Sequence, residues 1–397
     1  MAIHLRSGAA AASIVLAGAL ALVGCTGTTS PTPDPTGTTE PDAGGLPAVI
    51  ELLGVRDQTG AVAYTGISAA KGTALAVKQA AEEAFLGEGV TVEVDERDGA
   101  FDPTVASTAI TEGLASGNIS AILGPQISNE ALAVAPIAEA AQVPIVFTQS
   151  GVDGLLTGQF GYRASSSQSS VWPRAIEKIV ADGAKTVVTF VSANNATYNQ
   201  LGTVVIPPLL ADGGVEIAQT FDFESSVTDF AAAAGQAAAA SPDAIVVTLI
   251  GPQMPTLITQ LRQSGYEGPV YVTAAMTDDQ MKSMGDAGHD VFFPTNFSYA
   301  ISSGLPAEFT KAFQAEFGEN PDTYAAETYD QTWWVLRAIK QANSADPIAI
   351  NDALLALGLQ GFEGVQGKLT FIDGRDAVSP GVLVEWDPVA AVQKIAG

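Results

Sequence analysis

From residue 48 onward, short β-branched apolar runs alternate with longer stretches whose apolar residues recur at helical spacing. The first run spans residues 48–55, and the stretch over 66–85 carries the first helical pattern. Continuous apolar strands that alternate with helices predict a parallel sheet covered on both faces. The alternation restarts after residues 161–170. We therefore expect an α/β fold of two doubly wound lobes with mainly parallel sheets.

The length of the chain bears on its number of lobes, and its charge bears on its partners. A chain of 397 residues exceeds the length at which a single core stops growing, which favours two lobes. Acidic residues outnumber basic ones by 43 to 17, and the formal net charge is −26. A chain of this sign repels the phosphate backbone, so we expect no nucleic-acid partner.

The N-terminal segment carries the pattern of an export signal. Arg6 precedes an apolar run over residues 9–23, which is short for a membrane span and typical of a signal peptide over residues 1–24. The run ends in Leu-Val-Gly-Cys, which resembles the lipobox of bacterial lipoproteins and implies that Cys25 is lipidated at the outer face of the cell membrane. An uncleaved membrane anchor is the alternative. Residues 25–45 lack Val, Leu, Ile and aromatic side chains, so we expect a disordered tether there.

The tripeptide Gly-Pro-Gln ends two predicted strands, at residues 124–126 and 251–253. Ligands of open α/β sheets bind beyond the carboxyl ends of the strands. If the two lobes face each other, both tripeptides line the gap between them, and we expect one binding cleft there. Chance repetition is the alternative, because Gly and Pro commonly end strands.

Three segments resemble a known family. Residues 122–150 resemble the part of type I periplasmic binding proteins that carries Gly-Pro, Ser and Ala-x-Ala-Pro-x-Ala-Glu. Residues 320–342 resemble the late Tyr-Ala-Ala…Tyr-Asp helix of that family, and residues 362–376 resemble its Phe-x-Gly ending. The resemblance covers roughly residues 48–388 and is strongest to the branch typified by leucine/isoleucine/valine-binding proteins.

This resemblance implies an architecture and a function. Two lobes joined by three crossover strands close on a small polar molecule (an amino acid, amide or carboxylate), which is delivered to the permease subunits of an ABC transporter. The implied lobes comprise residues 46–164 plus 298–362 and residues 165–297 plus 363–397. We expect a monomer that needs no cofactor. The alternatives are a sensory receptor of the same fold and a surface hydrolase.

Lobe one supplies most of the implied site. Ser128 matches the family serine that grips a ligand carboxylate, and it stands where a predicted helix begins and backbone N–H groups favour an anion. A plain helix-capping serine is the alternative. Ser150 and Gly151 match a second carboxylate-binding loop, because glycine permits close backbone approach, with an ordinary turn as the alternative.

The loop before the first predicted helix contains Gln58, Tyr64 and Thr65. Family members place an aromatic lid in this loop. Thr65 occupies the position of that aromatic residue, so we expect Tyr64 to substitute for it. Gln126, in the first Gly-Pro-Gln, either points into the cleft or caps its own loop.

Lobe two matches the family less closely. Tyr198 matches a family tyrosine, and Gln253 lies on the second Gly-Pro-Gln. Amino-acid-binding members carry an acidic residue near Met276 that pairs with the ligand ammonium, and here Ala-Ala-Met-Thr stands in its place over residues 274–277. Either Asp278 takes that role or the ligand lacks an α-ammonium. We favour the second, with Met276 as a ligand-binding candidate, because an unpartnered buried charge is strongly unfavourable.

Catalytic signals are few. Of the two histidines, His4 lies in the predicted signal peptide, which leaves His289 and excludes a paired-histidine zinc motif. Residues 361–370 resemble a P-loop, but Leu369 follows the lysine where Ser or Thr is required. We therefore expect no catalytic residue and no metal site.

Overall fold

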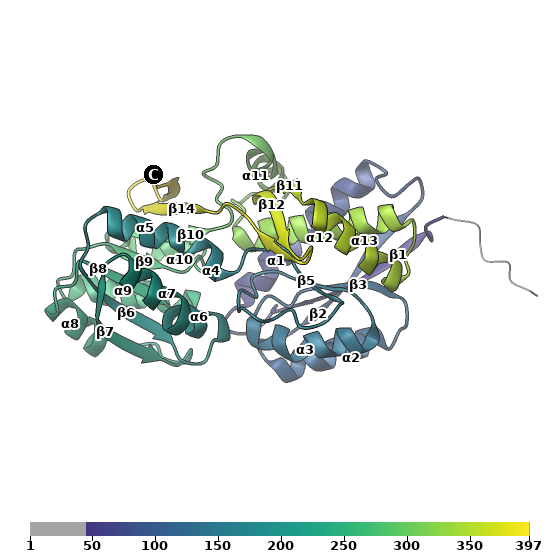
Figure 1. Ribbon diagram of the computed structural model, residues 1–397. Coiled ribbons are helices and arrows are strands. Elements are labelled where there is room, and N and C mark those ends of the chain that lie inside the picture. The colour runs from purple at the N-terminus through teal and green to yellow at the C-terminus, as the bar shows by residue number, and fades with distance from the viewer. Residues whose placement is uncertain (1–44, 397) are drawn as a thin grey trace, which may run out of the picture. The chain divides into compact units, whose positions relative to one another are not determined.

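The computed structural model describes residues 45–396. The predicted signal peptide, Cys25 and nearly all of the predicted tether lie outside the described residues. Two sheets organise the described part, each flanked by helices (Figure 1). The helices are α1 (Ala63–Glu82), α2 (Pro103–Leu114), α3 (Ser128–Ala141), α4 (Gln168–Val171), α5 (Pro173–Ala181), α6 (Ala196–Gln200), α7 (Ile206–Asp212), α8 (Ala231–Ala239), α9 (Met254–Gln263), α10 (Asp278–Ser283), α11 (Gly304–Phe317), α12 (Thr323–Ala342) and α13 (Pro347–Gln360).

The first sheet has eight strands and forms lobe one. Its order is β11 (Phe362–Gly364), β12 (Gly367–Ile372), β13 (Asp376–Val378), β5 (Gly161–Arg163), β4 (Ile145–Phe147), β3 (Ile119–Leu123), β1 (Val49–Arg56) and β2 (Thr91–Asp98). The strands from β13 to β2 are parallel, and β11 and β12 add an antiparallel edge. This arrangement confirms the prediction of a mainly parallel sheet.

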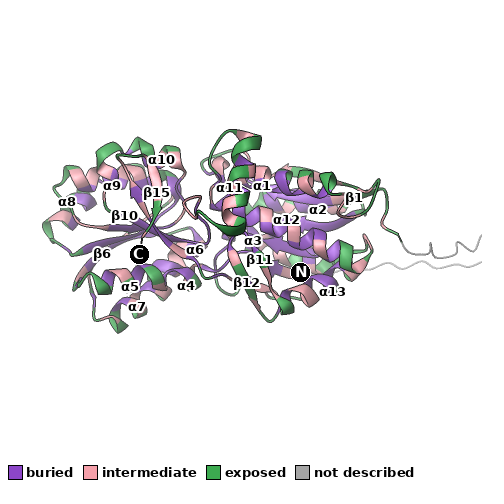
Figure 2. Ribbon diagram, turned by 90° about the horizontal axis from the view of Figure 1, so that it is seen from above, coloured by how far each residue is buried: buried purple, intermediate pink, exposed green. Residues whose placement is uncertain are grey.

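Strand β1 shows why the sheet is covered on both faces. Ile50 and Leu52 pack with Trp334 of α12 in one core. Leu53 and Val55 point to the other face and pack with Ile110 of α2. All of these side chains are buried, and Figure 2 shows buried strands beneath helices whose outer faces are exposed. A strand that is buried on both faces reads as the continuous apolar run seen in the sequence.

The second sheet has seven strands and forms lobe two. Its order is β15 (Val392–Ile395), β14 (Val382–Asp387), β10 (Val291–Thr295), β9 (Val270–Val272), β8 (Ala244–Thr248), β6 (Thr186–Ser192) and β7 (Glu216–Phe223). The five strands from β10 to β7 are parallel, and β14 and β15 are antiparallel additions. Separate cores on its two faces contain Leu257 of α9 and Ile176 of α5.

The chain passes between the two sheets three times. These crossings lie between β5 and α4, between β10 and α11, and between β13 and β14. The expected return to lobe two at residue 363 is wrong. Strand β12 pairs with β13, and β13 pairs with β5, so residues 362–378 extend the first sheet and the last crossing follows Val378.

The segment over residues 196–212 is an irregular helix. It consists of α6, a π-helical turn over Leu201–Val205, and α7. Pro207 and Pro208 follow directly on this π-helical turn and lack a backbone N–H, so they cannot donate to the preceding turn, which is consistent with the irregular helix there.

Among residues 45–396, no helix is long and apolar enough to cross a membrane. Within the same residues, no three His, Cys, Asp or Glu side chains are grouped as metal ligands.

Candidate functional site

The two Gly-Pro-Gln loops meet at one cavity between the lobes. The first follows β3 and contributes Gln126; the second follows β8 and contributes Gly251. The cavity is small in this closed form, with about 20 Å³ of free space, which is room for about one water molecule. Its lining comprises Val62, Tyr64, Thr65, Gln126, Ile127, Ser128, Gln149, Asn195, Thr197, Tyr198, Ile250, Gly251, Ala275 and Tyr324. Both lobes therefore supply its walls, as the carboxyl ends of facing sheets predict.

Five of the predicted site residues line this cavity. They are Tyr64, Thr65, Gln126, Ser128 and Tyr198. The lining residues that the sequence analysis missed include Gln149, Thr197 and Tyr324. Gln149 directly precedes the predicted Ser150, and Tyr324 belongs to the Tyr-Ala-Ala motif. Both lay within recognised segments, but the direction of their side chains was not readable from sequence.

The other five predicted residues lie outside this lining. The Gln58 backbone N–H donates to Asp98 Oδ1 at 2.8 Å, which ties the β1–α1 loop to the end of β2. The Ser150 hydroxyl donates to the Pro125 carbonyl at 3.1 Å. Met276 is buried in the core of lobe two.

Gly151 and Gln253 lie outside the cavity lining and make structural contacts. A Cβ on Gly151 would lie 3.2 Å from Thr197 Cγ2 of lobe two, so glycine allows the lobes to approach there. The Gln253 amide nitrogen donates to the carbonyls of Glu224 and Val227, both at 2.9 Å. Gln253 thereby secures a loop of lobe two.

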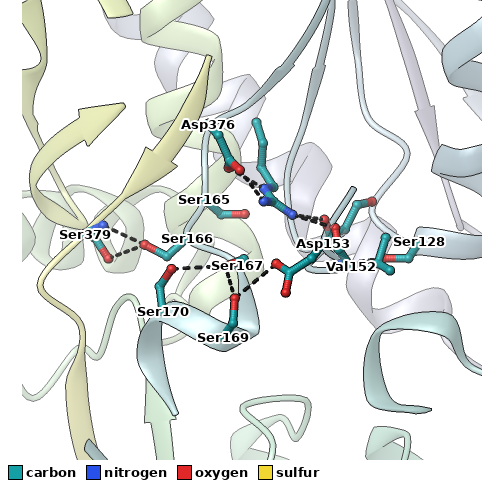
Figure 3. A network of polar contacts seen from close by, with 12 residues as sticks. Ser128, Val152, Asp153, Ser165, Ser166, Ser167, Ser169, Ser170, Asp376 and Ser379 are labelled. Carbon is teal, nitrogen blue, oxygen red and sulfur yellow. Dashed lines mark hydrogen bonds and ion pairs between the residues drawn. The ribbon is translucent and has the colours of Figure 1, made fainter. Parts of the chain in front are cut away.

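Ser128 joins the lobes and does not cap its helix. Helix α3 begins at Ser128, the residue before it is Ile127, and no side chain caps the helix start. The Ser128 hydroxyl instead lies 2.5 Å from the Thr197 hydroxyl of lobe two. Its oxygen also accepts from the Val152 N–H at 3.4 Å. Figure 3 shows Ser128 close to Val152.

Further hydrogen bonds hold the lobes against each other. The Asn129 side chain donates to the Asn194 carbonyl at 3.1 Å and accepts from the Ala196 N–H at 2.9 Å. The Asp153 N–H donates to the Gln200 side chain at 2.7 Å. The structure is therefore that of closed lobes around a small cavity.

A tyrosine from lobe one closes the opposite side. The Tyr64 hydroxyl donates to the Ala275 carbonyl of lobe two at 2.8 Å. The Tyr64 ring meets Tyr324 edge-to-face with ring centroids 5.8 Å apart. Burial raises the pKa of the Tyr198 phenol to about 12, and burial raises the pKa values of Tyr64 and Tyr324 as well. All three rings are therefore neutral hydrogen-bonding groups at physiological pH.

The lining carries no Asp, Glu, Lys or Arg. Asp278, the alternative partner for a ligand ammonium, lies on the wall of a separate outer pocket. Its carboxylate accepts from Asn320 and Gln393 at 3.3 and 3.2 Å. The cavity therefore offers neutral hydrogen-bonding groups only.

Two buried side chains in the lining have polar atoms without a protein partner. These are the Thr65 hydroxyl and both amide atoms of Gln126, and each residue is 1% exposed. Buried polar atoms of folded proteins are almost always hydrogen-bonded. A polar molecule bound in the cavity would satisfy them.

His289 does not serve Ser128 as a base. Its ring contacts the Asp286 carbonyl at 2.8 Å and the Glu267 carboxylate at 3.2 Å. The Ser128 hydroxyl instead contacts the Thr197 hydroxyl and the Val152 N–H, and neither group can act as a catalytic base. This geometry offers no support for the hydrolase alternative.

The two lobes and the enclosed cavity define a two-domain solute-binding protein. A model of the periplasmic binding protein family matches residues 50–391, so the chain belongs to that family. The family is one of extracytoplasmic, non-enzymatic solute-binding proteins, and the predicted type I resemblance and fold class are confirmed.

Solved structures share this fold. The leucine-binding protein LivK from Thermotoga maritima has a TM-score of 0.78 at 22% identity, over 88% of this chain and 98% of that one. LivJ from Streptococcus pneumoniae, solved with isoleucine, has a TM-score of 0.78 at 24% identity over 88% and 99%. An ABC-transporter solute-binding protein from Rhodopseudomonas palustris BisB5, solved with 3,4-dihydroxybenzoic acid, has a TM-score of 0.79 at 24% identity over 88% and 97%.

Proposed function

We propose that this protein is a lipid-anchored receptor that captures a small polar molecule lacking an α-ammonium and delivers it to an ABC import permease. The observation that carries the ligand class is the uncharged interlobe cavity with Thr65 and Gln126 unpaired in it. An ammonium in this cavity would have no carboxylate partner and would be strongly disfavoured. A carboxylate or an amide can pair with hydroxyl and amide donors.

The resemblance and the comparisons support the transport role. Amino-acid and aromatic-acid receptors share this fold, so the fold accommodates both ligand classes. Helix α3 begins at the cavity, and its N-terminal dipole favours an anionic group there. We therefore favour a small carboxylate over a neutral amide.

A thermal-shift screen of matched pairs tests the ligand class. Each pair holds an α-amino acid and its deaminated form: leucine with 4-methylpentanoate, and phenylalanine with 3-phenylpropanoate. Acetamide and 3,4-dihydroxybenzoate complete the set. A ligand at a thousand times its Kd stabilises by about 4 kcal/mol, which gives a clear shift. Deaminated members should raise the melting temperature more than their amino acids, and the reverse order would contradict the proposal.

Lipid anchoring has a separate test. Substituting Cys25→Ser removes the thiol that accepts the lipid, so the variant should leave the membrane fraction and appear in the soluble one. Retention of the variant in membranes would favour an uncleaved anchor. Loss of uptake of the identified ligand on deletion of this protein would support delivery to a permease; intact uptake would favour the sensory role.

A further inference from the structure

The three crossings between the lobes are joined by side chains. Ser166, Asn296 and Ser379 each lie on a different crossing. The Ser379 N–H donates to the Ser166 hydroxyl at 2.6 Å, and the Ser379 hydroxyl donates to Asn296 Oδ1 at 3.0 Å. All three residues are buried. Figure 3 shows Ser166 and Ser379 in direct contact.

Glu327 connects this joint to the cavity wall. Its Oε1 accepts from the Asn296 side chain at 2.8 Å, and its Oε2 accepts from the Gln149 backbone N–H at 3.0 Å. Glu327 is 2% exposed and lies in the first turns of α12. One buried carboxylate therefore bridges a crossing strand and the loop that contributes Gln149 to the cavity.

Arg163 holds the same loop from the other side. Its Nη1 donates to the carbonyls of Ser150 and Val152, both at 3.0 Å. Its guanidinium also pairs with both carboxylate oxygens of Asp376, at 2.7 and 2.6 Å. Arg163 directly precedes the first crossing, and Asp376 lies on the strand that precedes the third.

We infer that Glu327 and Arg163 are positioning residues that couple the cavity loop over residues 149–152 to the interlobe joint, so that lobe movement and ligand-loop geometry change together. This inference rests on the proposed function as a receptor. Neither side chain lines the cavity, so each acts through the backbone of the loop. A bidentate Arg–carboxylate pair and a doubly accepting carboxylate both fix geometry more tightly than single neutral hydrogen bonds.

The coupling should depend on pH through Glu327. Burial raises the pKa of this carboxyl to about 7, although hydrogen bonds from Asn296 and Gln149 act to lower it. An ionised carboxylate accepts on both oxygens, whereas protonation turns one oxygen into a donor. A protonated carboxyl is a weaker acceptor and its new O–H needs an acceptor of its own, so the links to Asn296 and Gln149 should weaken and the loop should loosen as the pH falls below 7. The groups that face Glu327 are Asn296, Gln149, Ser165, Thr323 and, as the titratable one, Tyr198 of lobe two.

Amide hydrogen exchange on the full chain tests the coupling without any ligand. In the wild type, the protection factor of Gln149, corrected for intrinsic exchange, should fall about tenfold from pH 8 to pH 6, the loss of one charged hydrogen bond. Glu327→Gln should remove this pH dependence. Glu177→Gln is the matched control, because Glu177 is exposed on α5 and lies away from the joint. Equal protection at both pH values in the wild type would overturn the inference.

Two further measurements distinguish a loss of coupling from a general loss of stability and from a failure of the receptor proposal. If Glu327→Gln raises exchange throughout residues 45–396, the substitution has destabilised the whole fold. The wild-type comparison between pH 8 and pH 6 then tests the coupling, because it involves no substitution. Arg163→Lys keeps the charge but loses the bidentate contact, so it should raise exchange at residues 150–152 more than elsewhere. A uniform rise in exchange would count against coupling.

If no compound binds, the receptor proposal fails while the exchange result still stands. If 3,4-dihydroxybenzoate binds, its affinity should fall from pH 8 to pH 6 in the wild type and stay constant in Glu327→Gln; parallel profiles would overturn the inference.

Discussion

The two Gly-Pro-Gln loops occupy equivalent places in their lobes, yet they present opposite ends of the tripeptide to the cavity. In the first loop, the Gln126 side chain lies in the lining with both amide atoms unpaired. In the second, Gly251 lies in the lining while the Gln253 amide is bonded to two carbonyls of its own lobe. The first loop therefore presents an unpaired glutamine side chain to the cavity, whereas the second presents its glycine.

The glycines show the difference most directly. Gly124 has φ +90°, and a Cβ there would lie 2.4 Å from the Val55 carbonyl inside lobe one. Gly251 has an ordinary backbone, but its Cβ would meet the Ala275 carbonyl at 2.0 Å and the Tyr64 hydroxyl of lobe one at 2.2 Å. The first glycine is needed inside lobe one alone, whereas the second is needed both for packing inside lobe two and for the approach of Tyr64 from lobe one.

Substituting Gly251→Ala should have the largest effect on binding. The added methyl group overlaps both the Ala275 carbonyl of lobe two and the Tyr64 hydroxyl of lobe one, so the second loop must shift and the lobes cannot close as they do here. Overpacking of this kind costs about 1–3 kcal/mol, and we expect ligand affinity to fall about a hundredfold. Isothermal titration with the ligand from the screen measures this, and small-angle scattering should show more open lobes.

Gly235→Ala is the control for that substitution. Gly235 lies in α8, and a Cβ there has no neighbour within 4 Å. The control should keep its affinity and gain up to about 1 kcal/mol of folding stability from helix propensity. An unchanged affinity in Gly251→Ala would show that the second loop does not limit closure.

Substituting the two glutamines compares the loops side by side. Gln126→Ala removes a recognition group, so affinity should fall by about 1–3 kcal/mol while the melting temperature of the free protein changes little. Gln253→Ala removes two hydrogen bonds inside lobe two, so the melting temperature should fall and affinity should change less. Calorimetry and thermal melts on both variants test this crossed pattern. Identical effects of the two substitutions would remove the distinction between the loops.

The sequence predicted the fold from periodicity because both faces of each parallel sheet are covered, as Ile50 and Leu53 on opposite faces of β1 show. The lobe boundary at residue 363 was wrong because β11 and β12 form a short hairpin with no helix to mark their sheet. The candidate site was predicted in part. Tyr324 was missed because its place in the cavity depends on how α12 packs against α1, segments far apart in the chain.

A buried acid pair distinguishes the helix that follows the first loop. Glu130 of α3 and Asp57 are both fully buried. Burial, and then the charge of Asp57, raise the pKa of Glu130 to about 9, above its unfolded value. The folded state therefore favours the protonated form, and stability from this group is full below pH 4.5 and declines as the pH rises toward 9. The residues of α9 after the second loop include no such acid.

Glu130→Gln should therefore flatten the decline of stability between pH 5 and pH 9. The amide can still donate to Asp57 but carries no charge to bury, so the variant should be more stable than the wild type at pH 8 by about 1–2 kcal/mol. Urea unfolding at pH 5, 7 and 8 measures the difference. Glu112→Gln, on the exposed face of α2, is the control. A variant that loses stability equally at every pH would show that the carboxyl is held by bonds that the amide cannot make.

Ser128→Ala should have the smallest effect of the series. The substitution removes the contact with Thr197, which joins the start of α3 to lobe two. A single neutral hydrogen bond contributes about 1 kcal/mol, so affinity should fall no more than about tenfold. Thr197→Val removes the same contact from the other lobe, and the double variant separates two roles for the serine. If Ser128 only joins the lobes, the double variant should bind as weakly as either single one. If Ser128 also contacts the ligand, Ser128→Ala should weaken binding further in the Thr197→Val background, and titration of all three variants decides between these outcomes.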